Sequence, residues 1–176
     1  MDLKLVAIGN RLLGDDGIAI KVIQCICERL RKLNITVVIG DTDYDKCFKN
    51  IDNNDYVFLV DSIFSGIKPG TVMVTPLNTH NISHYIMYST HGLNLIEYFK
   101  TSNTNLKGTY IGIEIGTIDF SSELSEDLKA SFDQICSEVY EFVFTSLNEM
   151  NNKKSWGVPQ LFYWKLIYFI YPLFFR

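Results

Sequence analysis

The sequence predicts an α/β protein built on a mixed, mainly parallel sheet, and three observations lead to this prediction. Short aliphatic runs alternate with stretches whose apolar residues recur every three or four positions, which is typical of strands joined by helices. One connection between strands is too short for a parallel crossover. The 176 residues, 47% of them apolar, suffice for one domain with a buried core.

The first half of the chain contains three predicted strands and one helix. An apolar strand covers residues 3–8, and β-branched strands cover 35–39 and 56–60, the last ended by Asp61. Apolar residues after Asp16 have the period of a helix with one buried face. They are Ala19, Val22, Ile23, Ile26, Leu30 and Leu33.

The second half begins with the strand that makes the sheet mixed. Only nine residues, 62–70, separate it from the strand before, so the strand at 71–74 is expected to run antiparallel to its neighbours. A helix from Thr90 or His91 to Lys100 and a strand over 109–114 follow. The last helix begins near Ser125, which can cap it. Its predicted buried residues are Leu128, Phe132, Ile135, Val139, Phe142 and Leu147.

The polar run 148–155 predicts a boundary between a domain over residues 1–148 and a linker and tail over 149–176. Residues 156–176 hold nine of the aromatic side chains, including both tryptophans. Lys165 interrupts this segment, which argues against a membrane span. The tail is interpreted as a packed or incidental extension, as a membrane-surface segment or as a partner-binding segment.

Composition excludes some classes of function. The net charge of −4 argues against nucleic acid, which is bound through clustered cations. The N-terminal residues lack the pattern of a secretory signal, and the four cysteines form no CxxC pair. We therefore expect a cytoplasmic protein with reduced thiols.

Acidic side chains follow two of the predicted parallel strands. Asp15 and Asp16 lie in the loop after the first strand, and Asp61 ends the third. The carboxyl ends of parallel strands meet at one edge of the sheet, where ligands collect. His91 joins these acids if its helix begins at that edge. Two carboxylates and one imidazole suit nickel, zinc or cobalt; solvated loop acids and a helix-capping histidine are the alternative.

Two other ligand chemistries compete with such a metal site. Gly9, Gly14 and Gly17 do not form G-x-G-x-x-G, which disfavours a nucleotide. Receiver domains of two-component signalling share the fold class, the acid pair and an acid at the position of Asp61. In receivers, however, the acid pair directly follows the strand, and the fifth strand delivers a lysine that residues 110–116 lack.

The stretch over residues 8–17, IGNRLLGDDG, resembles the opening motif of the hydrogenase maturation proteases, the endopeptidases that trim the large subunit of nickel-iron hydrogenases. Further matches follow in the same order and extend the resemblance from residue 1 to about residue 148. They are Asp41-Thr42, Leu59-Val60-Asp61, Lys68-Pro69-Gly70-Thr71, Thr90-His91-Gly92-Leu93 and Gly112-Ile113-Glu114-Ile115-Gly116.

This resemblance implies a three-layer α/β/α sandwich around a five-stranded sheet with one antiparallel strand. It also implies that Asp16, Asp61 and His91 are metal ligands and that the metal is nickel, supplied by the large-subunit precursor. Asp16 occupies a position that is glutamate in some members. Residues 40–43 depart from the family, because Gly-Asp-Thr-Asp replaces a glycine pair there.

The implied activity is that of an endopeptidase, classed as aspartic-type, which releases a C-terminal extension from the precursor once nickel is in place. Either the ion polarises the scissile carbonyl or an aspartate activates the water. Asp15 is the candidate base, and capping of the first helix is its alternative role. A non-catalytic maturation scaffold and a receiver-like phospho-acceptor are the alternative functions. The aromatic tail lies beyond the resemblance, so cleavage is expected not to need it.

Overall fold

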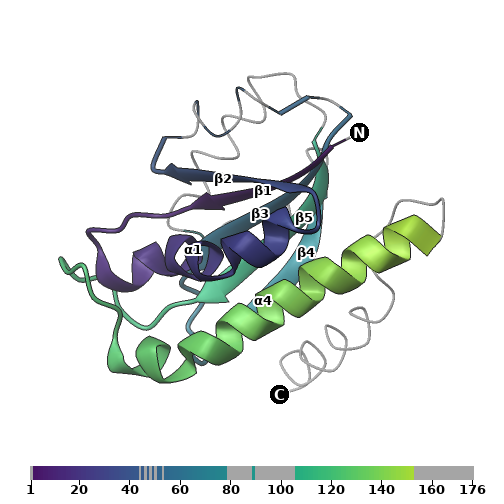
Figure 1. The fold of residues 1–176 in the computed structure, drawn as a ribbon. Helices are drawn as coiled ribbons and strands as arrows, with labels where there is room; N and C mark the ends of the chain where they lie inside the picture. The colour runs from purple at the N-terminus through teal and green to yellow at the C-terminus, as the bar shows by residue number, and fades with distance from the viewer. Residues whose placement is uncertain are drawn as a thin grey trace, which may run out of the picture.

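The computed structural model describes residues 2–43, 45, 47, 49, 51–52, 54–78, 89 and 106–152. Its strands form one five-stranded sheet in the order β2-β1-β3-β5-β4 (Figure 1). β1 pairs in parallel with β2 and β3, β3 pairs in parallel with β5, and β4 runs antiparallel to β5. The predicted mixed sheet is confirmed. The elements are β1 (Leu3–Ile8), η1 (Gly14–Gly17), α1 (Ile18–Arg31), β2 (Ile35–Asp41), β3 (Tyr56–Ile63), β4 (Val72–Asn78), β5 (Lys107–Glu114) and α4 (Glu126–Asn152).

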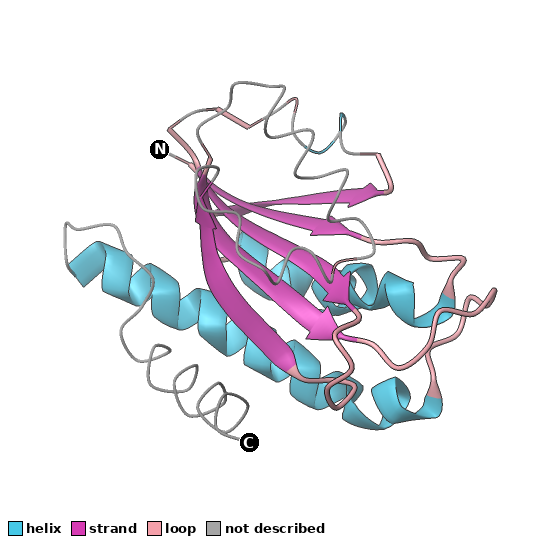
Figure 2. Cartoon of the chain, turned by 180° about the vertical axis from the view of Figure 1, so that it is seen from behind, coloured by secondary structure: helices cyan, strands magenta, loops and turns pink. Residues whose placement is uncertain are grey.

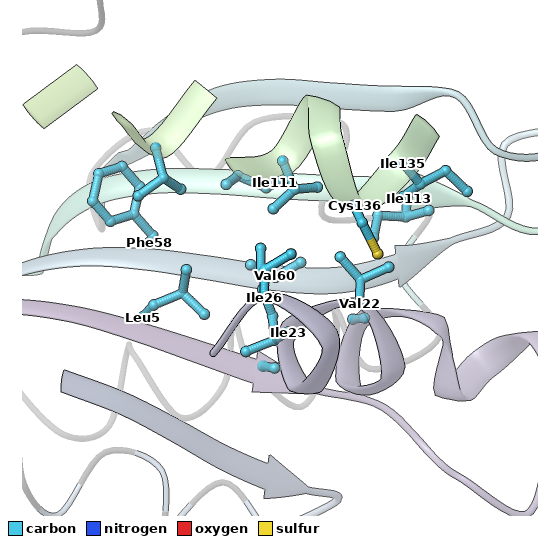
Figure 3. Close-up of a cluster of buried hydrophobic side chains, with 14 of the residues drawn as sticks. Leu5, Val22, Ile23, Ile26, Phe58, Val60, Ile111, Ile113, Ile135 and Cys136 are labelled. Atoms are coloured by element: carbon cyan, nitrogen blue, oxygen red, sulfur yellow. The ribbon is translucent and has the colours of Figure 1, made fainter. Parts of the chain in front are cut away.

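Helices α1 and α4 both cover one face of the sheet, as Figures 1 and 2 show from opposite sides. The larger apolar core lies between these helices and the strands. Figure 3 shows Val22 and Ile26 of α1 facing Val60 of β3, beneath α4. All six residues predicted for the buried face of α1 are buried or packed against this core, although Leu33 lies just beyond the helix end.

A second apolar cluster lies on the opposite face of the sheet. It includes Val57, Leu59 and Ile63, which alternate along β3 with the residues of the larger core, together with Cys47 and Ile51. All eight residues of β3 are buried, as expected for a central strand covered on both faces. The helix predicted from Thr90 or His91 lies outside the described residues.

Several strand and helix boundaries differ from the sequence-based predictions, among them those of β4, which continues to Asn78, and of β5, which begins at Lys107. β3 continues through Ile63, so Asp61 lies inside the strand, because β5 pairs with β3 as far as Glu114. β2 continues to Asp41. Helix α4 continues to Asn152, through most of the polar run predicted to end the domain.

The expected N-cap of α4 is present. The Ser125 hydroxyl accepts a hydrogen bond from the Leu128 backbone N–H at 3.4 Å, three residues into the helix. Residues 153–176 lie outside the described part, so the division into domain and tail stays a prediction. Within the described part, no helix combines the length and apolarity that crossing a membrane requires.

Candidate active site

The loop after β1 brings Asp16 back against the strand from which it departs. A Cβ atom on Gly9 would lie 2.4 Å from the main-chain oxygen of Asp16, so this approach requires glycine. The Asn10 backbone N–H donates to Oδ2 of Asp16 at 3.1 Å. The Gly-Asn pair that opens the motif therefore fixes the position of the Asp16 carboxylate.

Asp16 and Asp61, both predicted as site residues, meet through Ser62. The Ser62 backbone N–H donates to Oδ1 of Asp61 at 2.8 Å, and its hydroxyl donates to Oδ1 of Asp16 at 2.5 Å. All three residues are buried, with exposed fractions of 1% for Asp16 and 0% for Asp61 and Ser62. One serine thus links the two carboxylates at the side of the sheet where the parallel strands have their carboxyl ends, called here the carboxyl edge.

The second carboxylate oxygen of Asp61 is bound by two hydroxyl groups. Tyr110 of β5 donates to Oδ2 at 3.1 Å, and Ser89 donates to the same atom. Ser89 precedes His91 by two positions in the chain, and His91 itself lies outside the described residues. Asp61 therefore accepts hydrogen bonds from its neighbour Ser62 in β3, from Ser89 and from Tyr110 of β5.

Asp15 has a different set of partners from Asp16. Its Oδ2 accepts the backbone N–H groups of Gly116 and Thr117 at 3.2 and 3.3 Å, and its Oδ1 accepts that of Ser125 at 2.7 Å. The alternative expectation that Asp15 caps the first helix is wrong, since the N-cap of α1 is Gly17 and no side chain caps it. Asp15 instead holds the segment between β5 and α4. The role of a base stays a prediction.

Glu114, at the end of β5, was not singled out as a site residue. It is fully buried, and its Oε1 accepts the backbone N–H groups of Ser65, Gly66 and Ile67 at 2.9, 2.7 and 3.2 Å. The Ser65 hydroxyl donates to Oε2 at 2.6 Å. Glu114 thereby fixes the loop after β3. A carboxylate directly after the run Tyr110-Ile111-Gly112-Ile113 was the available sequence signal.

The departure from the family at residues 40–43 lies at the end of β2 and directly after it. Asp41 has a φ of +50°, a conformation that glycine adopts most easily. Its main-chain oxygen accepts the Gly9 N–H at 3.0 Å, and its carboxylate lies 2.5 Å from Nε of Arg11. Asp41 thus occupies a glycine-like position and adds a half-exposed ion pair beside the site.

Charge is distributed unequally between the two ends of the sheet. Asp15, Asp16, Asp61 and Glu114 are buried at the carboxyl edge. The buried cation among the described residues, Lys4, lies at the other end, where its Nζ is 2.7 Å from Asp55. The carboxyl edge therefore favours a cationic ligand.

Carboxylate oxygens can bind a divalent metal, but the described residues hold no group of three metal-ligating side chains. The structure brings together Asp16 and Asp61, two of the three side chains that the sequence predicts as metal ligands. A third has to come from the rest of the chain, from a bound partner or from water.

No family model and no curated protein matches the chain by sequence. Solved structures match its fold. The [NiFe] hydrogenase maturation protease HybD from Thermococcus kodakarensis has a TM-score of 0.59 and 22% identity, over 80% of this chain and 98% of that one. The maturating endopeptidase HybD from E. coli has a TM-score of 0.61 and 20% identity, over 79% and 90%. The maturation protease HycI from T. kodakarensis KOD1 has a TM-score of 0.60 and 22% identity, over 79% and 90%.

The fold is therefore the α/β fold found in hydrogenase maturation proteases, as the sequence motifs predicted. At these identities the likeness establishes the fold. The activity has to be argued from the site.

Proposed function

We propose that this protein is an endopeptidase that removes a C-terminal extension from the large-subunit precursor of a nickel-iron hydrogenase. The observation that carries the proposal is the link between Asp16 and Asp61 through Ser62. It joins two buried carboxylates at the carboxyl ends of the parallel strands, where ligands bind in open α/β sheets. The chain also has the fold found in maturation proteases. The motif containing His91 supports the same assignment.

Nickel enters this proposal as part of the substrate. Asp16, Asp61 and His91 are proposed to occupy open positions of a nickel ion already held by the precursor, so that binding signals completed metal insertion. Carboxylates and imidazole are suitable ligands for such an ion. Because Asp16 and Asp61 are already oriented by hydrogen bonds, little reorganisation is needed when the ion arrives.

Hydrolysis of the scissile bond adds water to the carbonyl carbon, breaks the C–N bond and transfers a proton to the leaving amine. Either an aspartate takes the proton from water or the ion polarises the carbonyl. Ser62 and Tyr110 act here as positioning groups, because each donates a hydrogen bond to a site carboxylate. The reaction is proposed to take place in the cytoplasm.

The test is mass spectrometry of a purified nickel-loaded precursor before and after incubation with the protein. Wild type is expected to shorten the precursor by one C-terminal fragment, and Asp61→Asn and His91→Ala are expected to leave it intact. The matched control is Asp133→Asn, a change at an exposed carboxylate on α4. An unshifted precursor mass with wild type, or full cleavage by both site variants, contradicts the proposal.

The sheet order bears on the receiver-like alternative. A receiver has the doubly wound order 2-1-3-4-5, whereas this sheet has the order 2-1-3-5-4 with β4 antiparallel. This topology disfavours a phospho-acceptor. A non-catalytic scaffold remains the alternative to a protease, and binding of the precursor without cleavage would identify it.

A further inference from the structure

Exposed apolar side chains gather at the edge of the sheet that holds Asp16 and Asp61. Among the described residues, the exposed large apolar side chains are Leu12 (60%), Phe64 (52%), Ile118 (44%), Phe120 (88%) and Phe144 (37%). The first four, named the apolar rim, lie on loops that follow β1, β3 and β5, whereas Phe144 lies on α4. Figure 2 shows these loops together beyond the ends of the strands.

Contacts connect the loops that carry the apolar rim. The Ser121 backbone N–H donates to the Leu12 carbonyl at 3.0 Å, which places Phe120 next to the loop after β1. Gly116 lies against the loop after β3, since a Cβ there would be 3.3 Å from Cγ of Pro69. The segment after β5 therefore touches both other loops.

Two buried carboxylates keep these loops in place. Asp15 binds three backbone N–H groups of the segment that carries Ile118 and Phe120. Glu114 binds three in the loop that carries Phe64. Such bonds offset the cost of burying a carboxylate, and they restrain the loops from turning their apolar side chains inward. Apolar surface that is held exposed in this way is typical of a binding site.

Charge indicates what kind of partner fits the apolar rim. Four carboxylates are buried at this edge, and among the described residues no buried lysine or arginine accompanies them there. A complementary partner combines apolar side chains with a cation that reaches the carboxylates. A polypeptide segment that carries a metal ion meets both requirements, whereas a second copy of this edge supplies apolar side chains but brings carboxylates to face carboxylates.

We propose that the apolar rim is the docking surface for the substrate polypeptide, binding apolar side chains of the precursor around its metal-bearing segment while the cation reaches Asp16 and Asp61. This inference rests on the proposed function and adds to it the surface that selects the substrate. The apolar rim contributes binding affinity, and binding of the ion by the buried carboxylates distinguishes a metal-loaded precursor from an empty one.

The test compares full-length Leu12→Ser/Phe120→Ser with wild type in steady-state cleavage of the nickel-loaded precursor. The matched control is Phe144→Ser, which removes an exposed phenylalanine from α4. KM is expected to rise about tenfold or more in the double variant, while kcat changes less than about twofold, because both side chains contribute to binding alone. The control is expected to keep the wild-type KM.

Phe120→Ser, at the most exposed position, serves as a second variant, and thermal midpoints verify that all variants are folded. An unchanged KM in both rim variants while wild type cleaves would overturn the docking inference alone. A wild type that neither binds nor cleaves the precursor would overturn the proposed function as well. Self-association of wild type that the rim substitutions abolish would assign the surface to a second copy and overturn the inference.

Discussion

Replacement of Asp15 by alanine separates a structural role from a catalytic one. The carboxylate is fully buried and accepts three backbone N–H groups at 2.7 to 3.3 Å. A hydrogen bond to a charged group contributes about 1.5–3 kcal/mol, and removal of the carboxylate also removes its burial cost. We expect Asp15→Ala to lower the free energy of unfolding by about 3 kcal/mol.

Urea and thermal unfolding measure this loss, which corresponds to a midpoint lower by about 6–12 °C for a domain of this size. Asp15→Asn should lose less unfolding free energy, because its amide oxygen can still accept hydrogen bonds from backbone N–H groups on one side of the side chain. Below its transition, Asp15→Asn is expected to cleave the precursor with kcat within about tenfold of wild type. An unchanged unfolding free energy combined with complete loss of cleavage would refute the structural role and identify Asp15 as the base.

The remaining predictions concern three separate regions. Burial raises the pKa of Asp55, but hydrogen bonds from Lys4 and two backbone N–H groups outweigh it, so the pKa is lowered from 3.8. The stabilisation contributed by the Asp55 carboxylate is measured as the difference in unfolding free energy between wild type and Asp55→Asn in urea titrations. It should therefore be complete above pH 3.8 and be lost as the pH falls through the lowered pKa. Gly9→Ala should cost about 1–3 kcal/mol in unfolding experiments and reduce cleavage, because its Cβ meets the Asp16 carbonyl. Deletion of residues 156–176 should leave cleavage of the precursor, measured by mass spectrometry, intact. A truncated protein that is folded but inactive would show that the tail helps to bind the substrate.

Local patterns predicted most of the sheet. The bounds of β1 and the antiparallel direction of β4 followed from one apolar run and one short connection, because such signals depend on neighbouring residues alone. The end of β3 was missed, since its last residues are ordered by pairing with β5, about 50 positions away in sequence.

The candidate site was likewise predicted only where the signal was local. Asp16 and Asp61 were predicted because the carboxyl ends of parallel strands converge. Ser62 and Glu114 were not, because their roles depend on which hydrogen-bond donors and acceptors the register of β3 and β5 brings within reach. The placement of His91 stays a prediction, since it lies outside the described residues.

The position of β4 in the sheet has a consequence for synthesis of the chain. β4 lies at the edge of the sheet, and its neighbour there is β5, which is made only after residues 79–106. On a ribosome, β4 must therefore remain unpaired until β5 has emerged and joined β3. Pro76, in the middle of β4, removes one N–H from the exposed strand and so limits pairing with other chains during this interval.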